Sequence, residues 1–388
     1  MSNIKNLIIN IKDDYIDSIK DTKKKIFKIK TISNIFTALF MLIISFATFI
    51  YGSKLLNYLV IPPYNNELHY IMMKAKEING DIDVAVFGAS AGLTLIDTKL
   101  LSETTDYHWY NTARSSMTSV ESEFYVKAIF KYHNPKYIFF EVDASRLYDS
   151  NYFDRNYIDT EISEDINPEL LKTIMSTTDK KKAFSDAFPW TKYIKKIFDY
   201  DYVKNNISIK KDLRNDQRIM SILNDYGLVE QDYIASQEPC TLEQLQSYYY
   251  DFIESNVNNL QLNAIKRSID FVNSKGSQII LFSPVKAYYL NKNIPARQRL
   301  NNFLNALAEE NECTYIDFSL IKREFFNRQP EDGSDQLFYD STHMTKNGSR
   351  LFTEKLAIFF EQVLINGVDK NEFLLANADE LIADYENF

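Results

Sequence analysis

The stretch that decides the fold is Val84-Ala85-Val86-Phe87-Gly88-Ala89-Ser90-Ala91-Gly92. Four apolar residues followed by small ones predict a short buried strand that turns sharply into a helix. The last five residues match Gly-x-Ser-x-Gly, in which small neighbours leave a serine exposed on a tight strand-to-helix turn. The N-terminus of that helix would direct backbone N–H groups to the place where an oxyanion forms. Taken alone, the pattern also suits a purely structural turn.

A second motif, Asp340-Ser341-Thr342-His343, lies near the other end of the chain. Of the four histidines, only His343 lies in a polar loop with a carboxylate three residues before it. That spacing allows Asp340 to face one imidazole nitrogen and leaves the other for a serine. We therefore predict Ser90 as nucleophile, His343 as base and Asp340 as the orienting acid. A capping Asp beside a solvent-exposed His is the structural alternative.

Short apolar strands alternate with amphipathic helices around these motifs. The predicted strands are 84–87, 107–110, 137–142, 278–282 and 314–318, and the predicted helices are 91–101, 120–132, 259–273, 294–311 and 346–363. This alternation predicts an α/β fold with a mostly parallel sheet covered on both faces. The alternation stops at about 144–245, which we interpret as a largely helical insertion after the third strand. The carboxyl end of such a sheet carries the ligand crevice, so the insertion is a candidate lid or a candidate surface for a partner. Alternatively, it has only a structural role.

An uncharged apolar run from Thr31 to Ser53 is long enough to cross a bilayer as one helix. Residues 1–30 carry eight lysines against four acidic residues, while just beyond the run there is only Lys54. This excess predicts a single-pass anchor in the cell membrane, with a cytoplasmic N-terminus and an extracytoplasmic catalytic domain. A cleaved signal peptide is the alternative, but its apolar core and its basic flank would both be shorter.

Composition and charge exclude other classes of protein. The net charge is −9, and the predicted extracytoplasmic part of the chain has no cluster of basic residues. Binding to nucleic acid needs such a cluster to neutralise phosphates, so we expect no nucleic-acid partner. The spacing of Cys240 and Cys313 fits no metal site, and the sequence leaves open whether they pair. No His, Cys and carboxylate cluster has ligand spacing, so no metal and no cofactor are expected. The predicted segments are a basic cytoplasmic segment, a transmembrane helix, a linker, a catalytic domain and an acidic tail, at 1–30, 31–53, 54–80, 81–365 and 366–388.

A serine after the first strand, with Asp-x-x-His shortly before the last helix, resembles the SGNH (GDSL-type) hydrolase superfamily over about residues 80–365. The order of these motifs differs from that of α/β-hydrolases, in which several strands precede the serine and the acid and histidine lie on separate loops. The resemblance implies a flavodoxin-like, three-layer fold with about five parallel strands. It also implies an oxyanion hole built from the serine N–H, a glycine after the second strand and an asparagine after the third.

The chain departs from that pattern in two loops. Residues 141–145, after the third strand, contain no Gly-x-Asn-Asp, and residues 111–115, after the second, contain no glycine. Asn111 is therefore either an oxyanion donor or a residue that only holds its loop. The backbone N–H groups of the loop that contains Arg114 and Ser115 are further candidates, and Gly88 and Gly92 are the glycines of the serine motif.

Together with the anchor, these departures resemble the membrane-tethered branch that includes DltD-, AlgJ- and AlgX-type proteins. That branch acts on cell-envelope polymers, in some cases beside a membrane-bound O-acyltransferase. The resemblance implies an acyl-enzyme on Ser90 whose acyl group passes to water or to a hydroxyl of a cell-surface glycan or teichoic-type polymer. The alternatives are a plain esterase, a non-enzymatic scaffold that binds a membrane O-acyltransferase or a glycan, and a lipase. The insertion contains no long apolar lid sequence of the kind that a lipase would need.

Overall fold

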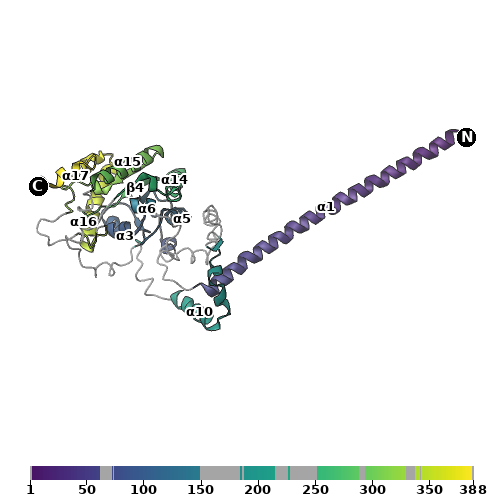
Figure 1. Cartoon of the computed structure of the whole chain (residues 1–388), viewed down its shortest axis with the longest axis horizontal. Coiled ribbons are helices and arrows are strands. Elements are labelled where there is room, and N and C mark those ends of the chain that lie inside the picture. Colours follow the sequence, from purple (N-terminus) through teal and green to yellow (C-terminus); the bar gives the residue numbers. More distant parts are fainter. Residues whose placement is uncertain are drawn as a thin grey trace.

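A computed structural model of the chain describes residues 2–61, 72, 74–148, 184–185, 188–214, 226–227, 251–287, 293–328, 337–340 and 342–386. Figure 1 shows a long N-terminal helix, a small helical unit around α10 at the end of that helix, and an α/β domain. Much of the predicted insertion at 144–245, including Cys240, lies outside the described residues. The predicted linker, 54–80, is described only in part.

Five parallel strands form one sheet in the order β2-β1-β3-β4-β5. They are β1 (Val84–Phe87), β2 (Trp109–Asn111), β3 (Tyr137–Glu141), β4 (Gln278–Ser283) and β5 (Thr314–Asp317). This order is that of flavodoxin-like folds, whose ligands bind beyond the carboxyl ends of the strands, where the strand order reverses. Here the reversal lies between β1 and β3. The predicted fold class is confirmed, and Ser90 follows the strand at that point.

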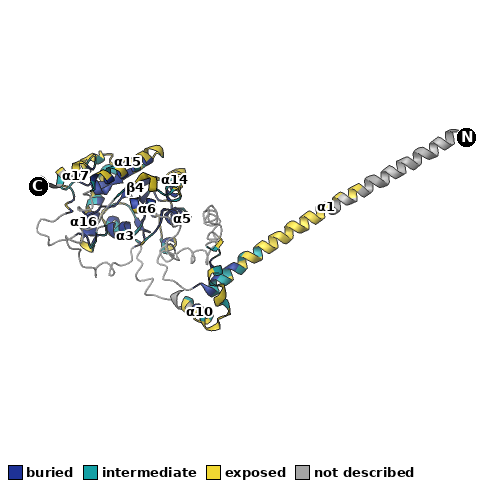
Figure 2. Ribbon diagram, viewed as in Figure 1, coloured by how far each residue is buried: buried dark blue, intermediate teal, exposed yellow. Residues whose placement is uncertain are grey.

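Helices cover both faces of the sheet because successive strand residues point to opposite sides. Ala85 and Phe87 belong to one core and Val84 and Val86 to the other. The first core is closed by α5 (Ser119–Ile129), α14 (Asn259–Ser274) and α15 (Ile294–Glu310), and the second by α3 (Ser90–Leu95), α4 (Thr98–Thr104) and α16 (Lys346–Phe359). Figure 2 shows buried residues around the sheet and exposed stretches on the covering helices α14 and α15. Shorter elements are α6 (Ala144–Tyr148), η1 (Pro189–Phe198), η2 (Glu254–Asn256), η4 (Phe318–Leu320), η5 (Phe360–Ile365), η6 (Lys370–Glu372) and α17 (Glu380–Glu386).

The helix predicted at 91–101 is two helices, because the chain bends at Asp97 between α3 and α4. The Asp97 side chain accepts a hydrogen bond from Leu100 N at 3.1 Å and so caps α4. Its own N–H donates to Thr353 Oγ1 of α16 at 3.0 Å, and Ser349 Oγ donates to Leu95 O at 3.3 Å. The bend therefore fixes α3 against α16, and the loop that contains His343 leads directly into α16.

The long N-terminal helix α1 runs from Ser2 to Val60. Among the described residues, its part Thr31–Val60 is the one helix that is long and apolar enough to cross a membrane, a test that a signal sequence also passes. Figure 2 shows an exposed stretch that ends close to residue 51. From Ser53 onward, one side of the helix is covered by the insertion, and Ser53, Asn57 and Val60 are buried. The apolar helix thus extends seven residues beyond the predicted end, and one side of its last turns is covered by protein.

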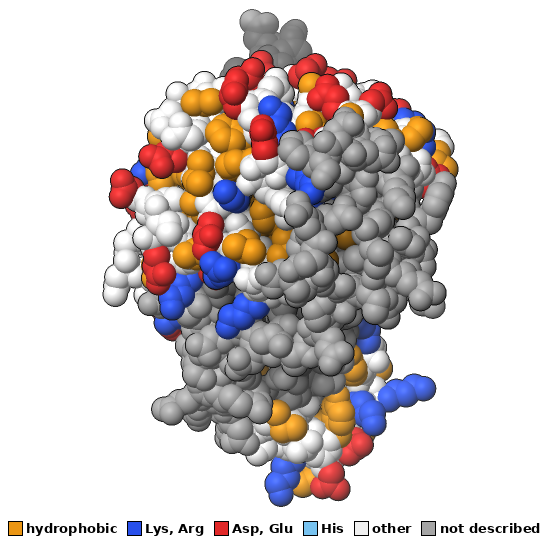
Figure 3. Space-filling model, turned by 90° about the vertical axis from the view of Figure 1, so that its left-hand side faces the viewer, with side chains coloured by type: hydrophobic (Ala, Val, Ile, Leu, Met, Phe, Trp, Pro, Cys, Tyr) orange, Lys and Arg blue, Asp and Glu red, His pale blue; other side chains and the backbone are white. Residues whose placement is uncertain are grey.

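The described insertion includes α10 (Tyr200–Arg214), and with η1 it packs against the end of α1. At the other end of the chain, the acidic tail predicted at 366–388 packs on the domain over its described part. Leu374, Ala378 and Leu381 are buried, and Leu375 N donates to Leu320 O at 2.8 Å. The described part of the tail beyond residue 365 is therefore packed as part of the α/β domain. On the face that Figure 3 presents, the described surface mixes acidic, basic and scattered hydrophobic side chains.

Candidate active site

The turn between β1 and α3 carries Ser90 at the first position of the helix. Its two glycines are required by one neighbouring side chain, that of Glu141. A Cβ on Gly92 would lie 2.6 Å from Glu141 Oε2, and a Cβ on Gly88 would lie 2.7 Å from Glu141 Cβ. The small residues predicted for a tight turn are therefore needed because a carboxylate packs beneath that turn.

Glu141 is the last residue of β3, the strand beside β1, and it is only 2% exposed. Its Oε2 accepts hydrogen bonds from the backbone N–H groups of Ala89 and Gly92, both at 2.8 Å. Hydrogen bonds to a charged acceptor are among the stronger ones in proteins. Glu141 therefore ties together the two sides of the turn that presents Ser90. This role was not predicted from the sequence, although an acidic residue that ends an apolar strand at the carboxyl edge of the sheet was an available signal.

Two hydrogen bonds join the three predicted catalytic side chains. Ser90 Oγ lies 2.6 Å from His343 Nε2, and His343 Nδ1 lies 2.6 Å from Asp340 Oδ2. Because Nδ1 faces a carboxylate, it carries the proton, and Nε2 is left to accept the hydrogen of Ser90 Oγ. Residues 90 and 343 come from opposite ends of the domain sequence, and the contact between α3 and α16 brings them together.

The loop before α16 is held in shape by the second oxygen of Asp340. This Oδ1 accepts from Thr342 N and His343 N, both at 2.8 Å, and Tyr339 N donates to His343 O at 3.1 Å. The Tyr339 ring stacks on the His343 ring with their centroids 5.4 Å apart. One carboxylate therefore fixes both the backbone of the loop and the orientation of the imidazole.

The same contacts set the charge of Asp340. Burial alone would raise its pKa, but the hydrogen bond and charge of His343, with the amides of Thr342 and His343, hold the pKa below its ordinary value. The carboxylate is therefore ionised at neutral pH. An ionised carboxylate stabilises the imidazolium that forms when His343 takes a proton.

The loop after β2 resolves the two roles considered for Asn111. Its side chain is fully buried, with Nδ2 donating to Ile96 O at 3.2 Å and to Gly92 O at 3.4 Å, while Oδ1 accepts from Ala113 N at 2.9 Å. The amide therefore holds the loop and the end of α3, and it is not available to an oxyanion.

Arg114 also holds its loop in place and does not face the triad as an open side chain. Its side chain is fully buried and donates to the carbonyls of Ala113 and Gly227, the latter at 2.9 Å. Its backbone N–H donates to Gly88 O at 3.0 Å, so the predicted use of this N–H for an oxyanion is wrong. Ser115, the next residue, is exposed. Because Glu141 binds the amides of Ala89 and Gly92, the elbow amides left for an oxyanion are those of Ser90 and Ala91.

A buried ion pair lies at the same edge of the sheet, just beyond β3 and β4. Lys286 Nζ and Asp143 Oδ2 are 2.7 Å apart, and both side chains are almost fully buried. Burial alone would raise the pKa of Asp143, but the charges of Lys286 and Arg297 and two hydrogen bonds hold it below its ordinary value. Among the described residues, no group of three or more His, Cys, Asp and Glu side chains is placed to hold a metal ion.

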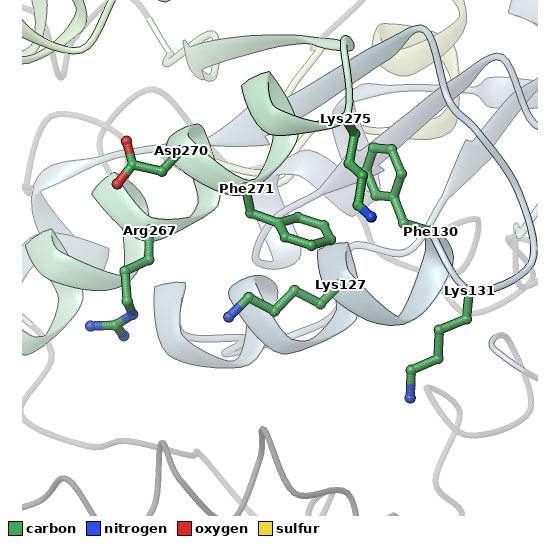
Figure 4. A pocket seen from close by; sticks show the side chains of 7 residues that line it. All are labelled: Lys127, Phe130, Lys131, Arg267, Asp270, Phe271 and Lys275. Atoms are coloured by element: carbon green, nitrogen blue, oxygen red, sulfur yellow. The ribbon is translucent and has the colours of Figure 1, made fainter.

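A pocket of about 580 Å³ lies away from this site, between the C-terminal ends of α5 and α14 (Figure 4). Helices that lead into β3 and β4 end at the amino edge of the sheet, opposite the triad. Lys127 and Arg267, two of its cations, are paired with Glu123 at 3.0 and 2.6 Å. Lysines at helix C-termini are also expected from the helix dipole. We therefore assign this pocket no part in the chemistry.

Similarity to known proteins supports the family predicted from the sequence. Residues 219–356 match the family described as GDSL-like Lipase/Acylhydrolase. This match covers 138 of the 388 residues and supports the predicted resemblance to SGNH (GDSL-type) hydrolases. The matched residues include β4, β5, Asp340 and His343. The match begins after Ser90, which the fold joins to the same site. It confirms the predicted enzyme class, that of esterases and acylhydrolases.

A solved protein from Bacteroides fragilis, provisionally named an acylhydrolase, is similar to this chain at 10% identity. The similarity covers 78% of this chain and 99% of that one, with a TM-score of 0.35. A TM-score this low does not establish a shared fold, which here rests on the strand order. No curated protein matches the sequence.

Proposed function

We propose that the chain is a membrane-anchored serine esterase or O-acyltransferase that acts outside the cell membrane on esters of a cell-envelope glycan or teichoic-type polymer. Ser90 is the nucleophile, His343 the base and Asp340 the acid that orients it. The observation that carries the proposal is the chain of two hydrogen bonds, each 2.6 Å long, from Ser90 Oγ through His343 to Asp340.

In this mechanism, Ser90 Oγ attacks the acyl carbonyl carbon while His343 Nε2 takes the hydroxyl proton. The tetrahedral oxyanion lies against the amides of Ser90 and Ala91 at the start of α3. Collapse of this intermediate breaks the ester bond, and the imidazolium gives its proton to the departing alcohol. Ser90 then carries the acyl group, and His343 is again a neutral base.

The second half of the reaction is the first half in reverse with a new acceptor. His343 takes a proton from water or from a polymer hydroxyl, whose oxygen attacks the acyl carbon and releases Ser90. Water gives an esterase and a hydroxyl gives a transferase, and both use the same side chains. A membrane-bound O-acyltransferase would be a suitable partner, because it would deliver acyl groups to the same surface.

The apolar part of α1 and the lysines before it support the anchor and its orientation. An anchor holds the enzyme close to envelope polymers, so that even modest affinity gives high occupancy. Protease treatment of intact cells without their wall tests this orientation. Survival of residues 80–388 in that treatment would refute an external domain.

The catalytic proposal is tested with the full chain in detergent and a fluorophosphonate probe, with the labelled residue identified by mass spectrometry. We expect labelling of Ser90 that is lost in Ser90→Ala and His343→Ala and kept in Ser115→Ala, a matched control on the neighbouring loop. Absence of labelling in a folded chain would favour the non-enzymatic scaffold. Acyl release with and without added glycan hydroxyls then separates hydrolysis from transfer.

A further inference from the structure

The described insertion covers one side of the C-terminal end of α1. Trp190 N donates to Asn57 Oδ1 at 2.9 Å, Tyr202 OH donates to Val60 O at 2.9 Å, and Asn206 Nδ2 donates to Ile61 O at 2.9 Å. Lys210 Nζ donates to Tyr58 O at 2.6 Å. Residues 184–185 and 188–214, which we call the collar, therefore satisfy backbone and side-chain groups at the point where α1 ends.

The collar also reaches back along α1 to its exposed apolar stretch. The Phe188 ring packs edge-on against Phe49, with centroids 4.8 Å apart, and the Phe184 ring lies 5.1 Å from that of Phe188. A helix rises 1.5 Å per residue, so Phe49 lies about 12 Å before Asn57 along the axis. The start of the collar is thus level with the last turns of the predicted membrane span.

The collar exposes several large apolar side chains within a short stretch of sequence. The exposed fractions of Ile194, Phe198 and Tyr200 are 41%, 89% and 75%, and that of Phe184 is 48%. Basic residues accompany them: residues 188–214 contain seven Lys and Arg against three Asp, in a chain whose net charge is −9. In Figure 3 the lowest part of the molecule, where Figure 1 places α10, shows hydrophobic side chains with both basic and acidic ones.

We propose that the collar lies in the outer interfacial layer of the bilayer that α1 crosses, with these apolar side chains at the boundary of headgroups and acyl chains. Aromatic and apolar side chains flanked by lysines are the composition that binds such interfaces, and the lysines attract anionic headgroups. We choose lipid rather than a protein as the contact of these side chains because the collar is bound to α1 at the point where the exposed apolar stretch of that helix ends. The collar therefore lies next to the predicted membrane span. The inference depends on the membrane anchor of the proposed function.

The test uses the full chain in vesicles of anionic phospholipid, with Cys240 and Cys313 replaced by alanine. An environment-sensitive fluorophore is attached to Phe198→Cys on the collar, to Phe40→Cys in the middle of the predicted span, or to Ile358→Cys, an exposed apolar site of similar type on α16. Lipids with a quencher near the headgroup are compared with lipids quenched deep in the acyl chain. Fluorophosphonate labelling of Ser90 reports that each variant is folded, independently of the membrane.

We expect the label at 198 to lose most emission to the shallow quencher, the label at 40 to the deep one, and the label at 358 to neither. Quenching at 40 without quenching at 198 would overturn the collar proposal and leave the anchor intact; a label at 198 shielded from both lipid and water would point to a protein partner and also overturn it. Lack of quenching at 40 would overturn the anchor, and the collar proposal with it.

Discussion

The contact between Glu141 and the serine turn leads to a sharp prediction about Gly92. In Gly92→Ala the new Cβ would lie 2.6 Å from Glu141 Oε2, whereas its next neighbour outside that carboxylate, Ala113 Cβ, is at an ordinary 3.6 Å. The end of the Glu141 side chain can move, so the main cost is not steric. It is the loss of the hydrogen bonds that Oε2 accepts from Ala89 and Gly92.

The magnitude follows from those two bonds. A hydrogen bond to a charged group contributes about 1.5–3 kcal/mol, and alanine in a helix returns about 1 kcal/mol relative to glycine. We expect Gly92→Ala to destabilise the domain by about 2–5 kcal/mol, since the two bonds and the helix term combine. In a Glu141→Ala background the bonds are already lost, so adding Gly92→Ala costs nothing further. The coupling between the two changes is then at least about 2 kcal/mol.

Gly88 provides the matched control. A Cβ at Gly88 would lie 2.7 Å from Glu141 Cβ, an atom that Glu141→Ala keeps. Glu141→Ala should therefore relieve Gly92→Ala but not Gly88→Ala. Urea unfolding of the full chain in detergent measures the stabilities, and fluorophosphonate labelling of Ser90 follows the geometry of the turn. Additive effects of Gly92→Ala and Glu141→Ala would refute the reasoning.

Three further predictions concern buried groups. Asp143→Ala leaves the Lys286 ammonium buried without its carboxylate and should cost about 3–5 kcal/mol in urea unfolding, whereas replacing both side chains by apolar ones of similar size should cost much less. The folded-state pKa values of Asp143 and Asp340 lie below the ordinary 3.8, so the stability that these two carboxylates contribute is complete above pH 3.8 and is lost as the pH falls through the folded-state values. Acid titration followed by circular dichroism should therefore show that unfolding begins below pH 3.8. A signal that stays flat at lower pH would contradict this prediction. Burial raises the thiol pKa of Cys313 to about 11, so its alkylation at pH 8 should be roughly 100-fold slower than that of a free thiol and should recover in urea, as mass spectrometry can measure.

Local sequence patterns predicted much of the fold because strands buried on both faces are short, continuous apolar runs. The strand Val84–Phe87 was predicted with its observed bounds, and the others differed by one or two residues. The break between α3 and α4 was missed, since the apolar spacing continues through it. Asp97, a good capping residue followed by Thr98, was the local sign of that break.

The chemical motifs were predictable only where their partners are close in sequence or chemically distinctive. Asp340 and His343 are three residues apart, and a serine elbow has a recognisable pattern. Glu141 bonds to amides 49 and 52 residues away, and no local pattern encodes that contact. Asn111 and Arg114 are polar residues in a loop near the nucleophile, which suggested a place in the site. Their full burial, which depends on tertiary packing, gives them structural positions instead.

The insertion also limits how far the catalytic domain can move. It is fixed to the end of α1 up to Arg214 and to the last residue of β2 at Tyr226, whose carbonyl accepts from Asn111 N at 2.9 Å. Twelve residue steps separate those two points, and a fully extended chain of that length covers about 40 Å. The segment from Ile61 to Met72 gives a similar limit. In the proposed location, these short tethers would therefore restrict the enzyme to esters of a long polymer that come within a few nanometres of its own membrane anchor.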